Sequence, residues 1–230
     1  MTFTILGRCP GSGQLGGAVT TSDIAVGARV LFAEAGLAVA ATQHSTDPRL
    51  GPALLEEIRA GRTAEEAVAA VAAATPHRDR RQIAALDARG RAAAHSGERV
   101  WPIAAQLAGQ DCLAVGNMLA SDRVAPAMVQ AFGAARGELT GRLLAALAAG
   151  ERAGGETGAL RSAAVLVVER EAFAFVDLRI DDDGDPLGRL SALWDVYRPR
   201  ARGVVARALD PGAAHRSSST TTSSPSRRAG

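Results

Sequence analysis

Thr2 is the residue whose type and position most directly suggest chemistry, because it follows Met1 and opens the apolar run of residues 2–6. An initiator methionine is usually removed when a small residue such as threonine follows it. Removal would leave Thr2 with both a hydroxyl and a free α-amine. The amine, whose unperturbed pKa is about 8, can take the hydroxyl proton, so one residue supplies nucleophile and base. Many proteins begin with Met-Thr, so an ordinary N-terminus remains the alternative.

Composition excludes several other kinds of chemistry. The 230 residues are 47% hydrophobic, which suits one globular domain. A net charge of +2 and 3% aromatic residues argue against a nucleic-acid-binding surface. All 26 basic residues are arginines, so the chain has no lysine for a Schiff base, a phosphate loop or a general base.

The two cysteines indicate a reducing environment. Cys9 and Cys112 are far apart and form neither a metal-type spacing nor a disulfide framework. The sequence has no apolar run of about 18 residues and no signal-peptide pattern. We therefore expect a cytoplasmic protein that does not enter a membrane.

Apolar runs and turn residues predict an α+β fold in which helices are layered outside β-sheets. The predicted strands cover residues 2–8, 14–21, 36–42, 82–87, 91–95, 112–116, 162–169 and 173–179. The predicted helices cover about residues 48–60, 64–75, 122–136, 138–153 and 186–197, and residues 63–66 form a capping box. The strands show little polar alternation, so we expect them to be buried on both faces. Residues 1–205 are predicted to form one domain, and residues 206–230 a disordered tail rich in Ser, Thr and Arg.

An ordered series of short motifs resembles the domain-of-unknown-function 1028 family. The series covers about residues 1–200, and its members are the segments 1–8, 13–19, 24–28, 40–43, 81–82, 86–91, 95–97, 116–120, 162–164 and 177–182. That family is similar to the N-terminal-nucleophile hydrolases, which have a four-layer αββα sandwich. The resemblance implies hydrolysis of a small amide or related C–N bond, with Thr2 as the nucleophile after Met1 is removed.

The resemblance also suggests roles for other polar residues. Asn117 follows a predicted strand, and its amide can donate to an oxyanion, although a turn residue or helix start is an equal alternative. Four residues are candidates for binding a small-molecule substrate, because glutamine amides both donate and accept and arginine suits a carboxylate: Arg8, Gln43, Arg81 and Gln82. Without a lysine beside the nucleophile, Arg8 or the amine itself must set the local electrostatics. No cofactor is expected.

Several polar positions depart from the family pattern, which favours a rival interpretation. The departures are at residues 22–23, 47–51, 155–162 and 181–184. They indicate a different substrate or a non-catalytic relative that binds a small molecule or forms a structural oligomer. Smooth Ala-rich helix faces make a homo-oligomer plausible under either interpretation.

Metal binding has weak support. The acidic run of residues 181–185 suits calcium in ligand type, but it lacks a terminal glutamate, so we expect an acidic turn in which Asp185 caps a helix. His44, His77 and His95 show no ligand spacing. We therefore predict no metal site.

Overall fold

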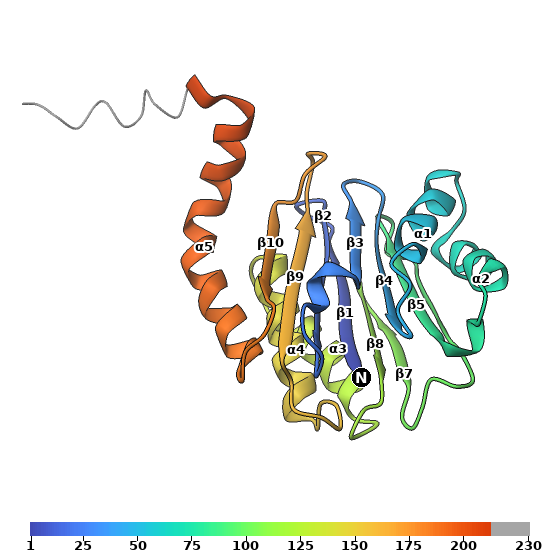
Figure 1. The fold of residues 1–230 in the computed structure, drawn as a ribbon. Helices are drawn as coiled ribbons and strands as arrows, with labels where there is room; N and C mark the ends of the chain where they lie inside the picture. The colour runs from blue at the N-terminus through green and yellow to red at the C-terminus, as the bar shows by residue number, and fades with distance from the viewer. Residues whose placement is uncertain (213–230) are drawn as a thin grey trace, which may run out of the picture. The chain divides into compact units, whose positions relative to one another are not determined.

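A computed structural model describes residues 1–212, in which two antiparallel β-sheets and five α-helices form a mixed α+β fold (Figure 1). The first compact unit is Met1–Trp194, and a second begins at Asp195. The candidate site lies in the first unit.

The larger sheet has six strands, and its centre is the N-terminal hairpin that the sequence predicted. Its order is β10 (Val176–Ile180), β9 (Ser162–Val168), β2 (Gln14–Thr21), β1 (Thr2–Cys9), β8 (Cys112–Asn117) and β7 (Ala105–Gly109). β1 is therefore hydrogen-bonded on both sides, to β2 and to β8. Both hairpin strands are almost completely buried, as their apolar composition predicted.

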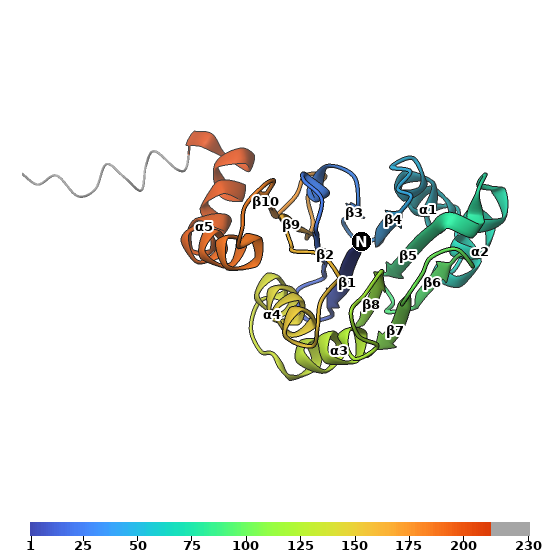
Figure 2. The ribbon, with the colours of Figure 1, turned by 60° about the horizontal axis from the view of Figure 1, so that its bottom comes forward.

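The smaller sheet has four strands and faces the larger one (Figure 2). Its order is β3 (Leu31–Glu34), β4 (Ala38–His44), β5 (Arg81–Asp87) and β6 (Ala92–Ser96). A shared apolar core joins the facing sheets, with Leu6, Val19 and Val115 from one and Val39 and Leu86 from the other. This core fixes how the ends of β1, β4, β5 and β8 approach one another.

Helices pack on the outer face of each sheet. α1 (Leu50–Arg59) and α2 (Ala64–Ala74) cover the smaller sheet, and α3 (Val124–Ala134) and α4 (Leu139–Arg152) cover the larger one (Figure 2). The Phe132 ring of α3 comes so close to Gly7 that a Cβ there would lie 2.7 Å from it, so only glycine allows this approach. The predicted capping box is confirmed, because the Thr63 hydroxyl accepts from the Glu66 N–H and the Glu66 carboxylate accepts from the Thr63 N–H.

Three elements differ from the sequence prediction. β3 and β7 were not predicted, and β7 is a largely exposed edge strand of Ala, Gly, Gln and Leu, residues with little strand propensity. α5 (Pro186–Leu209) continues past its predicted end near Tyr197 and contains Pro199, because good helix formers on both sides of the proline sustain the helix. The helix thus enters the first residues of the predicted tail, whose residues 213–230 lie outside the described part of the chain.

Candidate active site

The first residue of β1 lies beside polar side chains from both neighbouring strands. Thr2 is the direct cross-strand partner of Asn117 on β8, and the β1–β2 register places Thr21 on its other side. Paired residues project from the same face of a sheet, and side chains alternate along a strand. This face carries Leu6 into the core between the sheets, so Thr2, Thr21 and Asn117 point toward the smaller sheet.

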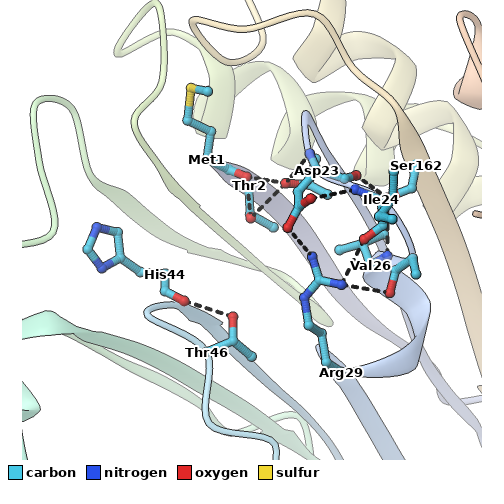
Figure 3. A network of polar contacts seen from close by, with 11 residues as sticks. Met1, Thr2, Asp23, Ile24, Val26, Arg29, His44, Thr46 and Ser162 are labelled. Carbon is cyan, nitrogen blue, oxygen red and sulfur yellow. Dashed lines mark hydrogen bonds and ion pairs between the residues drawn. The ribbon is translucent and has the colours of Figure 1, made fainter. Parts of the chain in front are cut away.

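Met1 and Thr21 enclose the Thr2 hydroxyl. That hydroxyl donates to the Met1 carbonyl oxygen (Figure 3). It lies 3.2 Å from the Thr21 hydroxyl, which donates to the same oxygen. Thr2 is only 7% exposed. In the chain that carries Met1, the Thr2 nitrogen is part of a peptide bond and cannot act as a base. The structure therefore shows the Thr2 hydroxyl held beside Met1 and Thr21, with the Thr2 nitrogen still acylated by Met1.

Buried amide side chains connect the two sheets directly beneath Thr2. Gln43 Nε2 donates to Gln82 Oε1 at 2.6 Å, and Asn117 Nδ2 donates to the same oxygen at 3.0 Å. The Thr4 hydroxyl donates to Gln43 Oε1 at 2.6 Å, and Gln82 Nε2 donates to the Gly116 carbonyl at 2.9 Å. The predicted residues Gln43, Gln82 and Asn117 thus lie together with Thr2, and their hydrogen bonds hold Asn117 in a single orientation.

Three residues of the described chain carry buried polar atoms without hydrogen-bond partners, and two of these residues flank the N-terminus. Within residues 1–212 these atoms are Arg81 Nε, Asn117 Oδ1 and both carboxylate oxygens of Glu156. Buried polar groups are normally paired, so each exception requires an explanation. Asn117 and Glu156 both flank the N-terminus. Three of the four unpaired atoms therefore belong to residues beside the N-terminus.

Glu156 is a member of this cluster that sequence reasoning missed. A bridge to Leu119 places it beside the end of β8, and it is 7% exposed. Burial raises the pKa of Glu156 to about 7, against the opposing effects of the N-terminal ammonium and of Ser22. Its neighbour Thr157 donates a hydrogen bond from its hydroxyl to the Met1 sulfur at 2.8 Å. No motif or spacing marks Glu156, because only the folded loop brings it to the N-terminus.

The structure does not bring the two predicted arginines to Thr2. Arg8 lies at the opposite end of β1, where it forms an ion pair with Asp111 at 2.5 Å. Arg81 immediately precedes Gln82, so its side chain leaves the opposite face of β5; there it donates to the Ser45 carbonyl and lies 3.9 Å from Asp47. Side-chain alternation along β5 therefore places Arg81 on the face opposite Gln82. The length of β1 places Arg8 at the end of that strand that is far from Thr2.

The loop after β2 forms one wall of the site and is held from two directions. The Ser162 hydroxyl donates to the Asp23 carbonyl at 2.7 Å and accepts from the Val26 N–H at 3.1 Å (Figure 3). Arg29 pairs with the Asp23 carboxylate at 2.9 Å and donates to the Ile24 carbonyl. The departure from the family pattern at residues 22–23 thus leaves an ordered loop beside Thr2.

The remaining candidates have structural roles. Asp185 caps α5 by accepting from the Gly188 N–H at 3.0 Å, as predicted. His44 and His95 contact the backbone carbonyls of Arg80 and Arg78. Within residues 1–212, no group of three His, Cys, Asp or Glu side chains is arranged to hold a metal ion. In the same part of the chain, no helix combines the length and apolar character needed to cross a membrane.

Comparisons with known proteins extend over this whole site. The family model described as "Family of unknown function (DUF1028)" matches residues 2–190. Among solved structures, the chain is similar to a protein from Silicibacter pomeroyi that is assigned to the same family, with 36% identity, a TM-score of 0.81 and 85% of each chain covered. No curated protein matches the chain.

Proposed function

The chain belongs to the DUF1028 family of unknown function, and from its site we propose that it is an N-terminal-nucleophile hydrolase that cleaves a small amide or related C–N bond. Thr2 is the nucleophile, and its own α-amine is the base once Met1 has been removed. Two facing sheets with helices on their outer faces are compatible with the αββα sandwich of such hydrolases and support this proposal.

The proposed reaction has two balanced steps. The α-amine of Thr2, directly or through a water, accepts the hydroxyl proton while Thr2 Oγ1 bonds to the substrate carbonyl carbon. The C–N bond then breaks, and the leaving nitrogen takes that proton from the α-ammonium. Water attacks the resulting Thr2 ester, so the acid is released and the hydroxyl is restored.

Asn117 suits two tasks in this reaction. Its Nδ2 carries two hydrogens, of which one is donated to Gln82, so the other is available to a developing oxyanion. One such donor is typically worth about 3 kcal/mol of transition-state stabilisation. Its Oδ1 is buried without a partner, and Asn117 is the cross-strand partner of Thr2. A free α-amine on Thr2 would supply the donor that this oxygen lacks.

The observation that carries the proposal is the enclosed Thr2 hydroxyl next to Asn117, at the end of the central hairpin. An exposed, frayed N-terminus would give no such position. Here β2 and β8 hold Thr2 from both sides, so the nucleophile lies on a rigid strand.

Intact-mass measurement and two Thr2 variants test the proposal. We expect the untagged protein to lack Met1 and to hydrolyse members of a panel of small amides. Thr2→Ser, which keeps a hydroxyl, should retain activity, while Thr2→Ala should lose about 10³-fold or more of kcat/KM. Full turnover by Thr2→Ala, or Met1 retained in an active protein, would contradict the mechanism.

A non-catalytic binding protein or structural oligomer is the second candidate. It is favoured by the amide chain of Gln43, Gln82 and Asn117, whose members largely satisfy one another and so resemble a polar core. This candidate predicts no amide turnover by the Met1-free protein. It also predicts the same stability for Thr2→Ser and the parent chain.

A further inference from the structure

Met1 occupies the space that an acyl group would fill in the proposed reaction. Its carbonyl oxygen accepts from the hydroxyls of Thr2 and Thr21, so the Met1 carbonyl group lies directly beside the Thr2 hydroxyl. Its side chain lies along the next loop, where Thr157 donates to its sulfur at 2.8 Å. A Cβ added to Gly158 would lie 2.9 Å from the Met1 Cε. Removal of Met1 therefore vacates a volume already shaped for an aminoacyl group.

Glu156 directly precedes the two residues that lie beside the Met1 side chain. Thr157 donates to the Met1 sulfur, Gly158 lies beside the Met1 Cε, and the positive charge of the N-terminal ammonium opposes the effect of burial on the pKa of Glu156. Neither carboxylate oxygen has a hydrogen-bond partner, and the N-terminal ammonium and Ser22 only partly offset the effect of burial, which raises the pKa of Glu156. A cation on a ligand would supply the missing compensation.

We propose that the site binds α-aminoacyl amides, with the Glu156 carboxylate pairing with the substrate α-ammonium and the Thr157–Gly158 segment lining its side-chain pocket. This inference rests on the proposed function, because it takes Met1 as a stand-in for the acyl part of the substrate. It predicts selection for a free α-ammonium group, which amide hydrolysis at Thr2 does not itself require.

The contacts favour the substrate amine over the Thr2 amine as the partner of Glu156. Glu156 is followed directly by Thr157, which donates to the Met1 sulfur, and by Gly158, where an added Cβ would lie 2.9 Å from the Met1 Cε. Thr2 is instead engaged through its carbonyl with Gln43, at 3.5 Å, and through its hydroxyl with Thr21. Glu156 therefore belongs to the subsite one residue beyond the nucleophile.

Binding to an inactive variant tests this inference without turnover. In the Thr2→Ala variant a small residue still follows Met1, so Met1 should still be removed. The intact mass of the variant should confirm that Met1 is absent. We would titrate it calorimetrically at pH 7 with L-methioninamide and with N-acetyl-L-methioninamide, which lacks the charge. We expect at least tenfold tighter binding of methioninamide, and near-equal binding of the two when Glu156→Gln is added. Glu151→Gln, an exposed carboxylate on α4, is the matched control and should leave the ratio unchanged.

The side-chain pocket has its own test. Gly158→Ala places a methyl group where the Met1 Cε lies, so it should weaken methioninamide binding at least fivefold more than alaninamide binding. Equal effects on both ligands would remove Gly158 from the pocket and overturn that part of the inference.

Three outcomes would overturn the Glu156 assignment: equal binding of the charged and acetylated ligands, a ratio that persists in Glu156→Gln, or Met1 retained in the purified parent protein. Selective binding without hydrolysis of any amide by the Met1-free parent would uphold the subsite and reject the proposed enzyme. Hydrolysis of acetylated and free aminoacyl amides at equal rates would uphold the proposed enzyme and reject the Glu156 subsite.

Discussion

Replacement of Gln82 by leucine should destabilise the protein strongly, although the two side chains have similar volumes. Gln82 is fully buried, and its Oε1 is the shared acceptor for Gln43 Nε2 and Asn117 Nδ2. Leucine leaves both donors without this acceptor, and an unpaired buried donor costs about 1–3 kcal/mol. The two together cost about 4 kcal/mol, which corresponds to a fall in Tm of about 8–16 °C for a domain of this size.

Urea unfolding followed by circular dichroism measures this loss, and Gln106→Leu is its control. Gln106 lies on the exposed strand β7 and accepts one hydrogen bond from Ser96, at 3.2 Å. We expect its replacement to change the free energy of unfolding by no more than about 0.5 kcal/mol. If the free energy of unfolding of Gln82→Leu lay within about 1 kcal/mol of the parent value, the buried amide chain would be refuted, because the loss of an acceptor shared by two buried donors must cost more than that.

Two further predictions concern stability. The first prediction concerns protein that keeps Met1 because it was produced with methionine aminopeptidase inhibited. The pKa of Glu156 is raised in its folded state, so between about pH 4.5 and pH 7 the folded protein holds a proton that the unfolded chain releases. The free energy of unfolding should therefore fall by about 3 kcal/mol as pH rises from about 4.5 to about 7, and then stay constant. Glu156→Gln should remove this fall in urea unfolding at pH 4.5 and pH 8, and an unchanged pH dependence would contradict the assignment. Gly51→Ala should cost about 1–3 kcal/mol, because the new Cβ would lie 2.0 Å from the Phe32 ring. Gly133→Ala, on another helix with no atom within 4 Å, should instead be neutral or stabilising by up to about 1 kcal/mol, and equal Tm shifts for the two variants would argue against the packing of α1 on β3.

Local sequence signals were sufficient for the elements that build the site. Two apolar runs separated by a turn at residues 10–13 predicted the β1–β2 hairpin and therefore the burial of Thr2 at its start. The Thr63 capping box located the start of α2 to the residue. These features depend on neighbours in the chain, so their physical causes are visible in the sequence.

The features that could not be predicted from the sequence depend on contacts between distant segments or on exposed positions without an apolar pattern. Arg8 and Arg81 were grouped with Thr2 by charge, but strand length and side-chain alternation place both elsewhere. Glu156 was missed because its environment arises from a bridge to Leu119, far away in the chain. β7 was missed because an exposed edge strand of small residues has no apolar pattern to detect.

The enclosed N-terminus has a practical consequence in a chain without lysine. The α-amine is then the only primary amine that the sequence supplies, so an amine-selective acylating reagent, followed by hydroxylamine to remove esters and thioesters, leaves a stable amide at one position. The rate of that labelling, compared between native and urea-unfolded protein, reports how far the pocket around Met1 or Thr2 shields the amine. A ligand that occupies the pocket would slow the labelling. Reactivity at a single atom could thus be used to screen compounds for this site before any substrate is known.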